Sequence, residues 1–187
     1  KDRLVARLPD YAATASRFAG LLNLRNRSGL LARIGEKVLG FSAYSEGWGL
    51  YAEFLPKEMG FYQNPYSDFG RLSMELWRAC RLVTDTGLHA KKWTREQAIQ
   101  YLLDNTPTSD NSASKAIERY IVMPSQATAY TIGMMKILEL RKRANDRLGT
   151  QFSLKEFHEV VLSNGALPLN TLEQLVESWI QKTLIGL

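Results

Sequence analysis

The sequence is poor in residues on which several protein classes depend. It has one cysteine, Cys80, and two histidines, His89 and His158, among 187 residues. A lone cysteine cannot form an internal disulfide or a cysteine-based zinc knuckle, so no oxidising compartment and no thiolate metal site is indicated. No apolar run approaches the roughly 18 residues that span a bilayer. The opening KDRLVARLPD lacks the apolar core of a signal peptide, so we expect any targeting signal outside this chain.

Most of the chain carries no net positive charge. The formal net charge is +5, and it arises within residues 1–40, which hold eight Lys and Arg against three acidic residues. Residues 41–187 are balanced, with 16 basic and 16 acidic side chains. Such a basic segment is more typical of a solvated face, or of one that meets an acidic neighbour, than of a DNA-binding stripe. Known nucleic-acid-binding signatures are also missing, so nucleic acid is not an expected partner.

Strand-type alternation is lacking, whereas signals for helix starts and stops are frequent. Thr94, Ser153 and Asn170 each stand three residues before Gln or Glu, the spacing of a capping box at a helix N-terminus. Gly149 and the pair at 164–165 can end helices in a left-handed conformation. These signals predict an all-α fold.

The helices expected between these signals fill most of the chain. They comprise a long helix over 67–86, a short one after Trp93, a polar break over 105–110, a helix over 115–121, and a second long helix from Pro124 to Leu148. Residues 10–40 are expected to be helical too, although glycines punctuate them. We therefore predict a multi-helix bundle: a single helical domain or fragment over 1–187, with a basic segment over 1–40 and a helical body over 41–187.

The stretch FSAYSEGWGLYAEFL, residues 41–55, carries two carboxylates in apolar surroundings. Glu46 and Glu53 are seven residues apart, so on a helix both project from the same face. One interpretation is that one carboxylate reaches solvent and the other pairs with an arginine of the core. The other is that Glu46 is a hard oxygen ligand for a metal, or an acid or base.

A second set of polar residues follows a helical spacing in RACRLVTDTGLH. Arg78, Arg81, Asp85 and His89 lie on one side if the helix persists through Gly87, and Asp85 can then fix the tautomer of His89. The alternative is that the helix ends at 85–87 and that the Asp–His pair is ordinary surface.

Two further residues could take part in chemistry. Tyr130, in RYIVMPSQATAYTIG, could donate to an oxyanion as it forms, although most tyrosines on helices simply pack. His158 is expected to be a partly buried structural histidine, because its helix is short and its acidic neighbours face water by periodicity.

Taken in order, five blocks of the chain resemble one known family. YSEGWGLYAE, RLVTDTGLHAKKWTREQA, RYIVMPSQATAYTIG, LRKRANDRLG and FSLKEFHEVVLSNGALPLNTLEQLV are similar to the C-terminal half of the bacterial domain-of-unknown-function family 885. The resemblance covers roughly residues 30–183.

Members of that family look like helical metallohydrolases with the general plan of zinc metallopeptidases, and some are lipoproteins or exported. The resemblance implies that Glu46 is a metal ligand, that His89 and Tyr130 line the cleft, and that Arg81 and Asp85 support them. It also implies a bacterial source, and a compartment that is exported or lipoprotein-anchored if a signal lies upstream.

One family feature is missing from the sequence. The family carries a His-Glu-x-x-Pro-Gly-His segment shortly before the Glu-Gly-Trp motif, whereas residues 20–30 here read GLLNLRNRSGL. Zinc in a hydrolytic site takes three protein ligands and water, so this chain is expected to be inactive alone. It would be a fragment or a deletion variant of a zinc-dependent, peptidase-like hydrolase.

The resemblance and the missing segment together set the expected partners. The N-terminal remainder of the same protein, a second copy of the chain and a peptide-like substrate are the partners we expect. We also expect Glu46, His89 and Tyr130 to converge on one cavity. The alternative is a non-catalytic helical module for interaction or oligomerisation.

Overall fold

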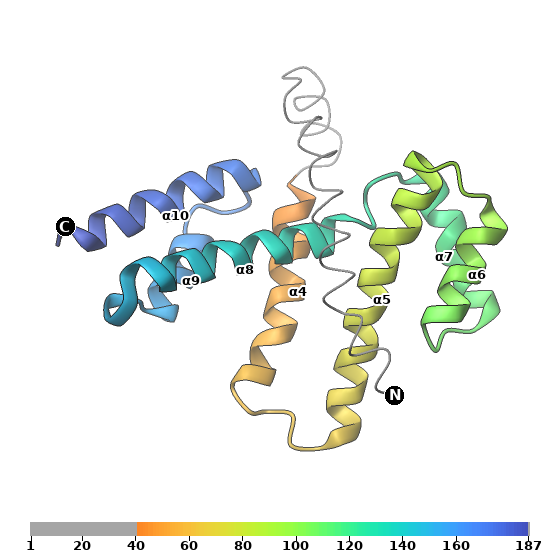
Figure 1. The fold of residues 1–187 in the computed structure, drawn as a ribbon, viewed down its shortest axis with the longest axis horizontal. Coiled ribbons are helices and arrows are strands. Elements are labelled where there is room, and N and C mark those ends of the chain that lie inside the picture. The colour runs from red at the N-terminus through yellow and green to blue at the C-terminus, as the bar shows by residue number, and fades with distance from the viewer. Residues whose placement is uncertain (1–40, 187) are drawn as a thin grey trace.

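The computed structural model describes residues 41–186. The expected helical region over 10–40 and the basic segment over 1–40 lie outside the described residues. Within 41–186 the chain forms seven α-helices and one 3-10 helix, with no strand, so the all-α prediction is confirmed for this part (Figure 1). The elements are α4 (Ser42–Glu58), α5 (Pro65–Ala90), α6 (Arg95–Asn105), α7 (Asp110–Val122), α8 (Ala129–Leu148), η1 (Gly149–Gln151), α9 (Leu154–Leu162) and α10 (Leu169–Leu184).

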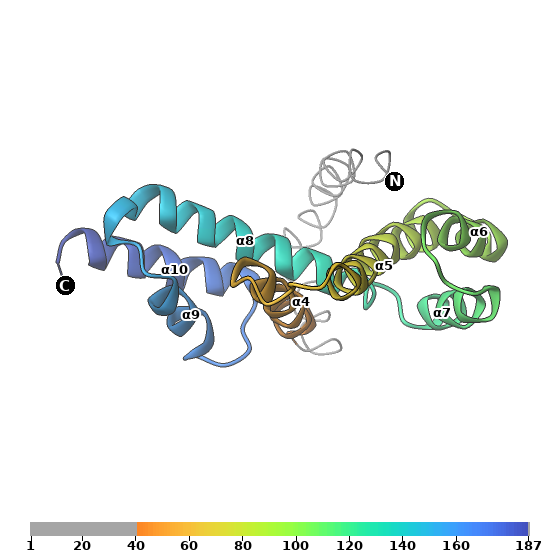
Figure 2. The ribbon, with the colours of Figure 1, turned by 90° about the horizontal axis from the view of Figure 1, so that it is seen from below.

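The helices pack into two hydrophobic cores rather than one bundle. The larger core joins α4, α8, α9 and α10, and its fully buried members include Tyr51, Ile137, Phe157 and Val176. The smaller core joins α5, α6 and α7 around residues such as Leu102. Figure 2 shows α8, α9 and α10 together at one end of the molecule, and α6 and α7 together at the other. Glu46 on α4, Arg81 on α5 and Gln126 before α8 are in contact where the two groups of helices meet.

Two glycines let α4 and α8 cross in close contact. A Cβ atom on Gly133 would lie 1.7 Å from the carbonyl oxygen of Ala43, and one on Gly47 would lie 2.3 Å from the Cα of Gly133. Both distances are far below van der Waals contact, so only glycine fits at either position. On both sides of this crossing the helices bury apolar residues at three- and four-residue spacing, as an amphipathic helix does.

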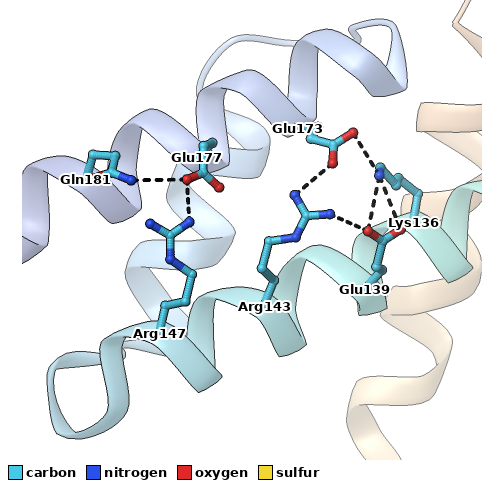
Figure 3. A network of polar contacts seen from close by, with 7 residues as sticks. All are labelled: Lys136, Glu139, Arg143, Arg147, Glu173, Glu177 and Gln181. Atoms are coloured by element: carbon cyan, nitrogen blue, oxygen red, sulfur yellow. Dashed lines mark hydrogen bonds and ion pairs between the residues drawn. The ribbon is translucent and has the colours of Figure 1, made fainter.

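Ion pairs line the seam between α8 and α10 (Figure 3). Arg143 donates to Glu173 at 2.7 Å, and Lys136 lies 2.8 Å from the same carboxylate. Arg147 pairs with Glu177 one turn further along both helices. These side chains are partly exposed, so each pair adds little stability, but their repeat along the two helices is consistent with one register of packing.

Several helix boundaries match the sequence signals. Thr94 forms the capping box predicted for it, and the Ser153 side chain caps α9 by accepting from the backbone N–H of Glu156. The end predicted at Gly149 is also found, where φ is +51°.

Two predicted starts are wrong. α10 begins at Leu169, so Asn170 lies in its first turn and is not the N-cap. Pro124 lies in a turn, and α8 begins five residues later, at Ala129.

Candidate polar site

A glutamine joins three elements at the junction between the two cores. The amide Nε2 of Gln126, in the turn before α8, donates to Glu46 Oε1 on α4 at 3.2 Å. Its Oε1 accepts from Arg81 Nη2 on α5 at 3.0 Å. Because a guanidinium can only donate, Arg81 sets the amide orientation and leaves the NH₂ group for Glu46. We call the residues Glu46, Arg81, Asp85, Gln126 and Tyr130 the polar junction.

Arg81 is held between two aromatic rings. Its guanidinium carbon lies 4.5 Å from the ring centroid of Tyr130 and 5.4 Å from that of Tyr120. Cation–π attraction of this kind is strongest where water is excluded. The Nε atom of Arg81 is buried without a hydrogen-bond partner among the described residues. The cation is therefore fixed in place while one of its donors is unused.

Asp85 is a buried carboxylate that holds the turn before α8. Its side chain is 2% exposed, and Oδ1 accepts from the backbone N–H of Ser125 at 3.0 Å. Ser125 has φ +72°, a strained conformation for a residue with a side chain. Oδ2 has no hydrogen-bond partner within the described part of the chain.

Burial raises the pKa of Asp85, although backbone N–H groups of Ser125 and Ala127 and the charges of His89 and Arg81 oppose this rise. A buried polar atom without a partner is uncommon and often marks a functional site.

His89 lies beside this junction but makes a different contact from the one the spacing favoured. Its Nε2 is 2.9 Å from the carbonyl oxygen of Tyr120, and the side chain is exposed. The helix does persist through Gly87, so the predicted alternative of a helix end at 85–87 is wrong. Asp85, however, is turned toward the Ser125 backbone, so among the described contacts it is Tyr120 that orients His89.

The structure links most of the predicted site residues through residues that were not singled out. Glu46 reaches Arg81 through Gln126, and Arg81 stacks on Tyr130. His89 is joined to the same set only through Tyr120. Gln126 lies in the stretch RYIVMPSQATAYTIG, but its role depends on residues 45 and 80 positions away. The expected cavity around Glu46, His89 and Tyr130 stays a prediction.

Glu53 has a separate role. Its Oε1 accepts from Arg78 Nη2 at 2.8 Å, with the Arg78 side chain 13% and the Glu53 side chain 48% exposed. The expected pairing of one carboxylate with a core arginine thus falls on Glu53, which itself remains half exposed. Glu46 and Glu53 therefore have different partners although they share one face of α4.

The described residues do not form a zinc site by themselves. Within residues 41–186 no group of three or more His, Cys, Asp or Glu side chains could hold a metal ion. Glu46 can offer a carboxylate oxygen, but a hydrolytic zinc site needs about three protein ligands. Any further ligands would have to come from outside this part of the chain.

His158 belongs to a second polar cluster, inside the larger core. Glu58 accepts from Arg141 at 2.7 Å, Arg141 donates to the hydroxyl of Tyr51 at 3.3 Å, and that hydroxyl lies 2.8 Å from His158 Nε2. Because the hydroxyl accepts from Arg141, its own proton can point to Nε2, which suits a neutral imidazole. Burial, followed by the charge of Arg141, lowers the pKa of His158. This position fits the expected structural histidine.

We expect the free energy of unfolding to fall as the pH drops below about 6.5, the pKa of histidine in an unfolded chain. The folded state lowers the pKa of His158, so the unfolded state binds the proton more readily and the stabilisation is lost as the pH falls through the folded pKa. Urea unfolding between pH 5 and 8 should show this slope. His158→Gln should reduce the slope, and an unchanged slope in that variant would contradict the assignment.

Comparisons with known proteins identify the family of this chain. The profile of the family described as "Bacterial protein of unknown function (DUF885)" matches residues 22–176. No curated protein matches the chain. Among the described helices, none combines the length and apolar character needed to cross a membrane.

Two solved structures are similar to this chain. A "putative lipoprotein" from Colwellia psychrerythraea is 49% identical with a TM-score of 0.75, over 80% of this chain and 26% of that one. A "putative lipoprotein of unknown function" from Shewanella oneidensis is 29% identical with a TM-score of 0.70, over 83% of this chain and 28% of that one. This chain thus spans about a quarter of each relative. With the profile match over most of its length, the chain belongs to the DUF885 family of bacterial proteins.

Proposed function

We propose that this chain is the C-terminal portion of a zinc-dependent, peptidase-like hydrolase and that the polar junction forms one wall of its active site. The contact path from Glu46 through Gln126 and Arg81 to Tyr130 carries this proposal. It joins three elements across the boundary of the two cores, and it contains Arg81 Nε, a buried polar atom that no described residue satisfies; Asp85 Oδ2, elsewhere in the polar junction, is another. Such unsatisfied groups cost free energy and are typical of sites that bind a ligand.

Each residue of the junction has a defined task in this proposal. Gln126 orients Glu46, and Arg81 orients Gln126. Tyr130 stacks on Arg81 and donates its hydroxyl proton as a hydrogen bond to the oxyanion of the substrate. His89 is a second donor in its protonated form, through Nδ1, because its Nε2 hydrogen is donated to the carbonyl of Tyr120. Asp85 holds the strained turn at Ser125 and so keeps Gln126 between the other two side chains. Asp85 and Arg81 are thus positioning residues.

Within residues 41–186, Glu46 is the one zinc ligand that we propose. The described residues do not fit a zinc site by themselves, so the remaining ligands belong to another part of the protein. The N-terminal remainder of the same polypeptide is the proposed source, because this chain spans only 26% and 28% of its two solved relatives. We accordingly propose that the isolated chain is inactive and that the peptide-like substrate meets the junction only in the full-length protein.

The relatives also bear on localisation. The quoted names of both read "putative lipoprotein". We propose that the full-length protein is exported or anchored through a lipid in a bacterium.

A second candidate function is a non-catalytic helical module that binds the rest of the polypeptide or a second copy. Exposed aromatic side chains at the turn between α4 and α5 favour it: Phe61, Tyr66 and Phe69 are 69%, 86% and 60% exposed. Clustered exposed apolar residues often mark a protein interface. This surface does not overlap the polar junction, so the two functions are compatible.

Metal analysis of the 187-residue chain beside the full-length protein tests the proposal. We expect one zinc per full-length molecule and none in the short chain, because the described residues offer one ligand at the junction. Hydrolysis of a peptide library should follow the zinc content. Zinc at full occupancy in the short chain would contradict the assignment of the missing ligands. Full-length protein without zinc and without hydrolysis would favour the interaction module.

A further inference from the structure

We propose that Arg81 binds a carboxylate of the substrate, so that the active site takes peptides or acylated amino acids with a free C-terminal carboxylate. This inference rests on the proposed function and names the substrate class of that same site. Its basis is which arginines of residues 41–186 form ion pairs with acidic side chains.

Arg81 differs from the other partly buried arginines in having no carboxylate partner. Six arginines of the described part of the chain form ion pairs with Asp or Glu: Arg71, Arg78, Arg95, Arg141, Arg143 and Arg147. Within residues 41–186 neither Arg81 nor Arg119 forms such a pair, and Arg119 is exposed, so water can solvate its charge. Arg81 is partly buried, where an unpaired charge is costly.

The comparison with Arg78, one turn earlier on α5, shows what Arg81 lacks. Both guanidinium groups lie over the ring of Tyr130, at 5.7 Å for Arg78 and 4.5 Å for Arg81. Glu53 neutralises Arg78 at 2.8 Å, whereas the hydrogen-bond acceptor of Arg81 is the neutral amide of Gln126. The nearest acidic residue on α5, Asp85, is turned toward the Ser125 backbone instead.

Arg81 is also arranged for binding in advance. Two tyrosine rings fix the plane of its guanidinium, and Gln126 engages one Nη2 donor, so little conformational entropy remains to be lost. The planar fork of a guanidinium matches a carboxylate with two parallel hydrogen bonds. A free C-terminal carboxylate lies beside the bond that a carboxypeptidase cleaves, and an internal peptide bond has no such neighbour.

Apolar side chains adjoin the turn that carries Gln126. Val122 and Met123, at the end of α7, are 74% and 42% exposed, and the carbonyl of Met123 accepts from the backbone N–H of Gln126. They suit the side chain of an apolar C-terminal residue, so we choose a leucine derivative as the probe.

The test is calorimetric binding of N-acetyl-L-leucine and N-acetyl-L-leucinamide to full-length protein treated with a chelator. We expect the acid to bind at least about tenfold more tightly than the amide, since only the carboxylate has a negative charge and two acceptor oxygens to offer the guanidinium. Arg81→Gln should abolish this preference. Arg119→Gln, the matched control, should retain it.

A second variant guards against loss of folding. Arg81→Lys keeps the positive charge but not the fork, so its preference should lie between those of wild type and Arg81→Gln. Equal binding of acid and amide by wild type, or equal loss in Arg119→Gln, would overturn the proposal.

A carboxylate from another part of the polypeptide is the other source of the same chemistry. In that case wild type should bind neither probe, and Arg81→Gln should lower the melting temperature more than Arg119→Gln; this result also overturns the proposal. The measurement needs neither zinc nor turnover. A protein without hydrolase activity could therefore still show the preference, and a missing preference would leave hydrolysis untouched.

Discussion

Replacing Gly133 by alanine is expected to lower the free energy of unfolding by about 3 kcal/mol or more. The added methyl would lie 1.7 Å from the carbonyl oxygen of Ala43 and 2.7 Å from the Cα of Gly47, and both are backbone atoms that cannot rotate away. α4 and α8 would have to separate, and the larger core between them would lose contacts. Alanine favours a helix by only about 1 kcal/mol over glycine, so the clash decides the sign.

Gly49→Ala is the matched control for this change. Gly49 lies inside α4, the helix that Gly133 of α8 faces, but a Cβ on Gly49 would meet nothing within 4 Å. Its replacement should be neutral or stabilise the chain by up to about 1 kcal/mol. Equilibrium unfolding in urea measures both variants. Equal stability of Gly133→Ala and Gly49→Ala would show that the two helices do not cross as closely as described.

The end of α5 shows where local signals were insufficient. Asp85, Thr86 and Gly87 read as a plausible helix end, because glycine is a poor helix former. In the structure Gly87 lies inside α5. Only glycine fits there, because a Cβ would lie 2.4 Å from the ring of Trp93. The glycine thus serves packing with a residue six positions later, and no propensity for helix ends could reveal that.

The turn before α8 was mispredicted for a related reason. Proline commonly opens a helix, so Pro124 was a reasonable start. Instead Ser125 takes a positive φ, and its N–H donates to Asp85, 40 residues earlier. The sequence could predict helix existence and the caps at Thr94 and Ser153, because those depend on neighbours within one turn. Contacts between distant segments decide the turn, and with it the place of Gln126.

In the candidate site, too, helical spacing predicts which residues share a face but not the contacts between distant residues. Helical spacing placed Arg78 and Arg81 on one face, and the structure puts both against Tyr130. Nothing in the spacing could show that Glu53 would neutralise one arginine and leave the other with an amide. That difference arises from a contact between residues 25 positions apart on α4 and α5, which helical spacing cannot predict.

The Glu46 side chain carries the second large expected effect. In the full-length protein, Glu46→Gln should reduce kcat/KM for peptide hydrolysis more than about 100-fold, because even residues that only support metal ligands cost about 10- to 100-fold when changed. Zinc affinity should fall as well, since a neutral amide replaces the carboxylate proposed as ligand. The new amide can still accept from Gln126 Nε2 through its carbonyl oxygen, so the expected loss falls on the metal and not on the contact with Gln126.

Glu53→Gln provides the matched comparison, because the two residues share a helix, a face and a chemical change. Glu53 pairs with Arg78 and is itself 48% exposed, and a glutamine there can still accept from the 13% exposed Arg78, so its replacement should cost about 1 kcal/mol of stability. We expect its kcat/KM to remain within about fivefold of wild type. Zinc content and steady-state rates on the same preparations separate the two variants. If both lose activity alike, the damage is to α4 as a whole, and Glu46 has no special place at the metal.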